Sequence, residues 1–124
     1  MPPKQMLGAS SFSQTGPTTD VPLNAANCGA LGDNAIVAGA AGIRQKLLSL
    51  TLIAAGNVTL TIGSDTGGTF AALTGPMGLL TSGQLTLPMN EDGWCQSASG
   101  KALNFKLGGA IVLNGVAKVQ QVQG

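Results

Sequence analysis

Apolar and polar residues alternate most regularly between positions 43 and 62. The apolar residues occupy every second position in each half of this stretch: Leu48, Leu50 and Leu52, then Val58, Leu60 and Ile62. The positions between them carry hydroxyl groups: Ser49, Thr51, Thr59 and Thr61. A period of two is typical of β-strands with one buried and one polar face. Because residues 54–57 include Gly and Asn, which suit tight turns, the pattern predicts a central β-hairpin over residues 43–62.

Shorter stretches of the same kind follow this segment. They predict further strands over residues 35–38, 69–73, 77–80, 84–87, 94–97 and 102–107, and a last hairpin made of residues 110–113 and 116–122. The turn of that hairpin is Asn114-Gly115, a strong two-residue hairpin signal. No segment keeps a helical apolar stripe free of glycine. Short strands at this spacing predict an all-β fold, a jelly-roll-like antiparallel β-sandwich.

The first 27 residues keep neither the strand period nor the helix period. They are rich in Ser, Thr, Gln and Asn, and their prolines are Pro2, Pro3, Pro17 and Pro22. We therefore predict an extended N-terminal arm over residues 1–27 and one β-sandwich domain over residues 28–124. Two alternatives stay open for the arm. It is either a floppy terminus or a segment that orders against a neighbouring subunit and loses its entropy on binding.

Charge is scarce along the whole chain. Charged residues make up 9% of it and the net charge is +1, whereas soluble domains usually carry about 25% charged residues. Lys101 and Lys106 are separated by an apolar strand and form no patch. The sequence thus lacks the basic footprint of nucleic-acid binding. A surface so poor in charge is weakly protected against association, so we expect partner subunits to cover much of it.

The hydroxyl residues of the 43–62 segment fit that expectation, because hydroxyls cost less to desolvate than charges. Ser49, Thr51, Thr59 and Thr61 are therefore candidates for contacts between subunits or between sheets. Residues 1–7 lack the apolar core of a signal peptide. The apolar runs also end well before the roughly 20 residues that a membrane helix needs. No membrane partner is expected.

The two cysteines, Cys28 and Cys95, lie far apart and fit no metal-binding spacing. A disulfide between them is possible, but in a protein made in a cytosol two reduced, partly buried thiols are expected. The chain has no histidine, which removes the usual partner of serine and cysteine nucleophiles and the commonest zinc ligand.

Three further features could carry chemistry. Asp65-Thr66-Gly67 matches the aspartic-protease triplet, but it stands among Gly and Ser residues that favour an ordinary turn. The oxygens of residues 90–93 could hold Ca²⁺, yet the EF-hand spacing is absent and a solvated turn is expected. Trp94 is expected to be buried with its N–H satisfied, the alternative being a platform for stacking sugars. We expect no enzyme, no catalytic residue, no cofactor and no metal.

From Gly42 onward the chain resembles small virion proteins of tailed bacteriophages. The matching strings are AGIRQKLLSLTLIAAGNVTLTI, LTGPMGL, the Pro-x-Asn-x-x-Gly-Trp of residues 88–94, GKALNFKL and the terminal strand. Proteins with this layout resemble head decoration (cement) or head-fibre domains. The resemblance implies a jelly-roll-like sandwich, often trimeric, that binds the major capsid protein on the outer surface of the head and is made in the host cytoplasm. The N-terminal segment and Cys28 lie outside it. A tail or fibre module and a carbohydrate-binding β-sandwich remain alternatives.

Overall fold

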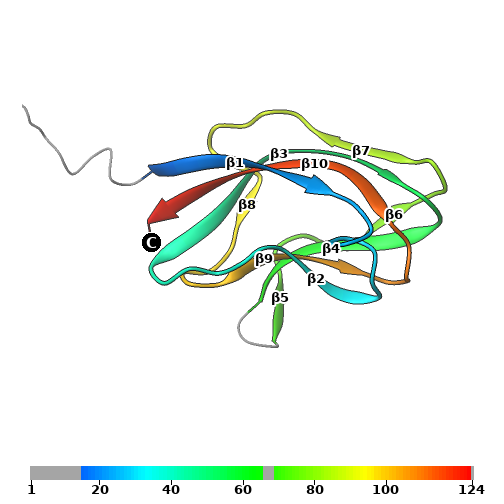
Figure 1. Ribbon diagram of the computed structural model, residues 1–124, viewed down its shortest axis with the longest axis horizontal. Coiled ribbons are helices and arrows are strands. Elements are labelled where there is room, and N and C mark those ends of the chain that lie inside the picture. The colour runs from blue at the N-terminus through cyan, green and yellow to red at the C-terminus, as the bar shows by residue number, and fades with distance from the viewer. Residues whose placement is uncertain (1–14, 66–68, 124) are drawn as a thin grey trace, which may run out of the picture.

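A computed structural model describes residues 15–65 and 69–123, which form ten strands and no helix (Figure 1). The strands are β1 (Thr15–Leu23), β2 (Gly32–Val37), β3 (Ile43–Ala54), β4 (Val58–Asp65), β5 (Phe70–Ala72), β6 (Met77–Leu79), β7 (Gln84–Leu87), β8 (Cys95–Gln96), β9 (Ala102–Leu107) and β10 (Leu113–Gln123). They form two facing antiparallel sheets. The all-β sandwich prediction is confirmed, and the strands predicted over residues 84–87 and 102–107 have the observed bounds.

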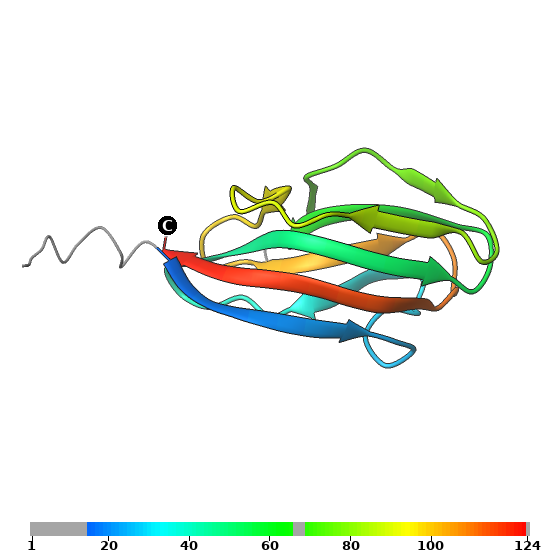
Figure 2. The same cartoon turned by 90° about the horizontal axis from the view of Figure 1, so that it is seen from above.

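The strands near the start of the chain pair with strands near its end. The first sheet runs β1-β10-β3-β7, with β8 also paired with β3, and Figure 2 shows these four strands side by side. The second sheet runs β2-β9-β4-β5, with β6 also paired with β4. β1 thus pairs with β10, β2 with β9 and β3 with β8, but this nested pairing ends there, because β7 also pairs with β3 and both β5 and β6 pair with β4. The pairings place strands from distant parts of the sequence side by side in the two layers of a β-sandwich.

The predicted hairpin over residues 43–62 is wrong, although both of its strands exist. β3 belongs to the first sheet and β4 to the second, so residues 55–57 cross between the layers. Alternation shows that a strand has a buried face but says nothing about its neighbour. Each strand turns its apolar face to the core that the two sheets share. Ser49 and Thr51 consequently lie on the outside of one sheet, and Thr59 and Thr61 on the outside of the other.

The core between the sheets consists mainly of leucine. Its largest apolar members, each less than 2% exposed, are Leu47, Leu50, Leu52, Leu60, Ile62, Leu103, Phe105, Leu107 and Leu113. A β-bulge interrupts the alternation of β3, because Ser49 pairs with Lys118 while Leu47 pairs with the next residue, Val119. Leu48 is the extra residue, and it is buried without belonging to the core cluster. The expectation that Leu48 shares a face with Leu50 is therefore wrong, since a bulge shifts the alternation by one position.

The predicted boundary between arm and sandwich at residues 27 and 28 is also wrong. Thr15–Leu23 forms β1, which pairs with β10 from Thr15 opposite Val122 to Leu23 opposite Gly115. The alternation pattern did not predict this strand, because Pro17 and Pro22 are unfavourable in most strands. Proline is tolerated there because β1 is an edge strand whose outer N–H groups need no partner. The rest of the predicted arm, residues 1–14, lies outside the described residues.

The last predicted hairpin is replaced by one long strand. Asn114-Gly115 lies inside β10, which runs without a turn between β1 and β3. A Cβ atom added at Gly115 would lie 2.7 Å from Leu52 Cα and would also meet the Thr51 carbonyl oxygen. The glycine therefore permits the close approach of two central strands. The Asn-Gly pair predicts a turn, but in the structure its glycine allows β10 and β3 to approach closely.

We predict that Gly115→Ala lowers the free energy of unfolding by about 1–3 kcal/mol, because the added methyl group forces β10 away from β3. Chemical denaturation followed by circular dichroism measures the change. Gly75→Ala is the matched control, since nothing lies within 4 Å of a Cβ added there, and it should stay within about 0.5 kcal/mol of the wild type. Equal stabilities for the two variants would contradict the close approach.

Candidate functional site

The outer face of the first sheet carries a row of uncharged side chains that crosses four strands. The register places Pro22 of β1 beside Val116 of β10, Val116 beside Thr51 of β3, and Thr51 beside Thr86 of β7. All four residues are exposed, and Ile53 lies two residues further along β3 with 43% of its surface exposed. We call these five residues the uncharged row. Its lack of charged side chains fits the centre of a protein interface, where charged residues are depleted.

One ion pair borders the uncharged row. Lys118 Nζ lies 3.4 Å from Asp20 Oδ1, and both side chains are largely solvated. An exposed pair of this kind contributes little to stability. It does, however, leave this part of the face electrically neutral. The face therefore offers apolar contact and hydroxyl hydrogen bonds rather than a field that would attract a polyanion.

The sequence identified only Thr51 of the uncharged row as a contact candidate. Val116 and Pro22 were missed because the predictions placed them next to a turn and in the arm. Ile53 stands at a polar-phase position, two residues after Thr51, but its place on a central strand becomes known only from the pairing of β3. The signal that could have found them is an apolar residue at a polar-phase position of a strand, but it needs the strand register first.

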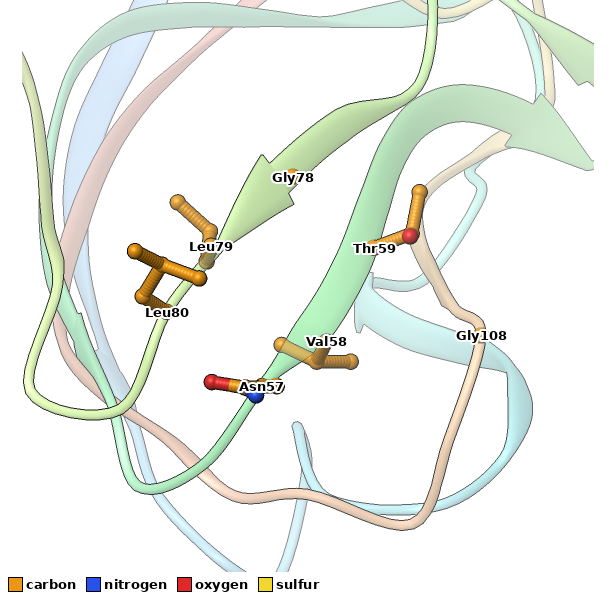
Figure 3. Close-up of a pocket in the computed structure, with 7 residues that line it drawn as sticks. All are labelled: Asn57, Val58, Thr59, Gly78, Leu79, Leu80 and Gly108. Carbon is orange, nitrogen blue, oxygen red and sulfur yellow. The ribbon is translucent and has the colours of Figure 1, made fainter.

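A second feature is a hollow of about 390 Å³ on the second sheet (Figure 3). Thr59 of β4 pairs with Gly78 of β6, and Gly108 N donates to Thr59 O at 2.9 Å on the other side. The two glycines leave space on either side of Thr59, with Leu80 at the rim 72% exposed. Asn57 Oδ1 already accepts a hydrogen bond from Thr81 N at 2.9 Å. The hollow is a concave surface, but no charged side chain lines it.

The protease triplet begins at the end of a strand. Asp65 is the last residue of β4 and pairs with Phe70 of β5 and Ala102 of β9. Thr66 and Gly67 lie outside the described residues. Within residues 15–65 and 69–123, no group of three or more acidic or cysteine side chains is placed to hold a metal ion.

The segment from Asn90 to Gly93 is a turn, as predicted. Gly93 N donates to Asn90 O at 2.8 Å, and Asp92 N donates to Asn90 Oδ1 at 3.0 Å. Gly93 adopts a φ of 81°, which favours glycine. The Asn90 side chain is thus used to shape the turn, while Glu91 and Asp92 are exposed.

Trp94 is exposed, so the prediction of a buried indole is wrong. It is 45% exposed, because β8 beyond it is only two residues long and no strand covers the ring. The other half of the prediction is confirmed, since the indole N–H donates to Pro88 O at 2.8 Å. That bond fixes the ring against the turn and leaves an aromatic surface facing solvent.

The two cysteines are free thiols. Cys28 is fully buried and belongs to the core cluster. Cys95, in β8, is partly buried and packs against that cluster. Burial raises the pKa of each thiol to about 11. Both groups are therefore protonated at neutral pH and are poor nucleophiles.

Comparison of the chain with protein-family models, with curated proteins and with solved structures finds no match. In the part of the chain that the structure describes, no helix is long and apolar enough to cross a membrane.

The thiol pKa values predict how stability depends on pH. Between pH 9 and pH 11 the unfolded chain releases thiol protons that the folded protein keeps, so the free energy of unfolding should fall as the pH rises through this window. Denaturation midpoints measured at pH 8, 9, 10 and 11 test this. A Cys28→Ala/Cys95→Ala variant should show a shallower fall, and a slope identical to that of the wild type would refute the assignment.

Proposed function

We propose that the protein is a structural virion protein, a capsid decoration or cement subunit that binds and stabilises the shell of the major capsid protein. The observation that carries the proposal is the uncharged row, an exposed strip of Pro, Val, Thr and Ile side chains across four strands of one sheet. Jelly-roll-like sandwiches are frequent in capsid proteins, which supports the proposal by analogy of fold. The resemblance of residues 42–124 to phage head proteins supports it further.

Such a subunit acts by burying its face across the joints between capsid subunits. Binding to the assembled shell but not to separated subunits stabilises the shell by mass action, by about 2.7 kcal/mol per site at a free concentration of 100 Kd. A specific contact buries about 800 Å² per partner. The uncharged row supplies the desolvated centre of that area, and solvated pairs such as Lys118 and Asp20 supply its rim.

The same proposal includes the assembly and the place of the protein. We expect a homo-oligomer with closed symmetry, a trimer being favoured by the resemblance. It would lie on the outer surface of the head after synthesis in the host cytoplasm. Neither nucleic acid nor a membrane is a partner in this account, in keeping with the low charge of the chain.

We predict that Val116→Asp weakens binding to decoration-free particles at least tenfold, because a carboxylate in the centre of the uncharged row would have to be buried without a partner. Thr59→Asp, at an exposed strand position on the opposite sheet, is the matched control and should bind normally. Binding is measured by co-sedimentation, and its consequence by the temperature or salt dilution at which particles rupture. Wild-type binding by the Val116 variant, or loss of binding by the Thr59 variant alone, would contradict the choice of face.

A carbohydrate-binding sandwich is the second candidate, and the exposure of Trp94 favours it. The fixed, half-exposed indole presents a surface on which a sugar ring could stack. Glycan binding that Trp94→Ala abolishes and Val116→Asp leaves intact would favour this function, or a receptor-binding role on a tail or fibre, over cementing.

A further inference from the structure

A groove of about 280 Å³ lies on the outer face of the first sheet, at the other end from Ile53. Its lining residues are Thr18, Lys46, Leu48, Met89, Glu91 and Gln120. Thr18 pairs with Gln120, and Gln120 pairs with Lys46, so one cross-strand row crosses the sheet under the groove. The turn that follows β7 forms the remaining wall, held to β3 by Asn90 N, which donates to Leu48 O at 3.0 Å.

The groove is fixed in shape and partly apolar. Leu48, the bulge residue, forms its apolar floor. Lys46 Nζ donates to the Glu91 carbonyl oxygen at 3.2 Å, and the stem of Lys46 lies against Gly93, where an added Cβ atom would collide with it. Met89 is 56% exposed on the wall. The exposed part of Met89 is apolar surface, and covering it on binding is favourable.

β1 passes beside this groove, and its backbone runs away from the groove from Thr18 back to Thr15. Thr18 lines the groove, and the strand continues back to Thr15, opposite Val122 near the end of β10. Figure 2 shows this end of β1 next to the C-terminal end of β10, at the end of the sandwich. Residues 1–14 span up to roughly 46–50 Å when extended. They can therefore reach well beyond the sandwich from which they start.

The composition of residues 1–14 is complementary to the groove. Their large apolar residues include Met6, Leu7 and Phe12, and their one charged side chain is Lys4. The groove offers the exposed side chain of Met89 to the former and the exposed side chain of Glu91 to the latter, whereas Leu48 is only 3% exposed. Phe12 lies three residues before Thr15, so it could reach the groove of its own copy only if the chain reversed immediately before β1, whose pairing with β10 extends to Thr15.

We infer that residues 1–14 of one copy bind in the groove of a second copy. The groove is then an interface between copies of this chain, and the segment links them. This inference stands apart from the proposed capsid binding, because it concerns only how the protein associates with itself.

Disulfide trapping between two variants tests the inference directly, each variant carrying one introduced cysteine together with Cys95→Ala. Phe12→Cys protein mixed with Gln120→Cys protein under mild oxidation should give a covalent heterodimer on a non-reducing gel, because only contact between copies can form it. The native thiols do not compete, because Cys28 is fully buried and Cys95→Ala removes the half-buried second thiol. Phe12→Cys mixed with Thr59→Cys, on the opposite sheet, is the control and should stay monomeric. Leu7→Cys, used in place of Phe12→Cys, tests whether a different part of the segment lies in the groove.

Two results would overturn the inference. One is a bond that forms within the Phe12→Cys/Gln120→Cys double variant but in neither mixture, which would place the segment in its own groove. The other is the absence of any bond at both segment positions. Self-association gives an independent measure: Met89→Asp should weaken it at least tenfold by sedimentation velocity, with Thr59→Asp unchanged. Met89 is exposed in a turn, so its replacement leaves the fold intact. Wild-type association by the Met89 variant would also overturn the inference.

Discussion

The packing of two apolar sheet faces against each other is the constraint on which the structure depends. With only three Phe and one Trp, the chain builds its core from Leu, Ile and Val on facing strands. Both layers must be in place to bury such a core, and the chain crosses between the sheets after β1, β2, β3, β6, β8 and β9. The central strands β10 and β3 must also approach closely, which Gly115 permits. Everything on the outer faces, including the uncharged row, is positioned by this packing.

The positions of the strands could be predicted from the sequence far better than the pairing between strands. Alternation located β3, β4, β7 and β9, because a half-buried strand must repeat every two residues. It could not locate β1, whose prolines are tolerated only at an edge, or join β10 across Asn114-Gly115. Paired residues such as Thr15 and Val122 lie more than a hundred positions apart in the sequence, so pairing depends on contacts that no local pattern encodes.

The same limit applies to the candidate site. The hydroxyl positions of β3 and β4 were visible as polar, yet they proved to lie on opposite faces of the sandwich. The uncharged row combines residues from four strands, so it exists only after folding. The turn at Asn90 was predictable because its hydrogen bonds are local, whereas the exposure of Trp94 depends on which strands fail to cover it.

A flat, neutral face on a rigid sandwich suits a protein that works by contact, and its place on a particle is the central claim of this account. Electron cryomicroscopy of purified particles tests that claim most directly. We predict density for the sandwich on the outer surface of the head, with the outer face of the first sheet, and Val116 at its centre, turned toward the shell. Density on the tail alone, or a sandwich attached to the head through its second sheet, would contradict it.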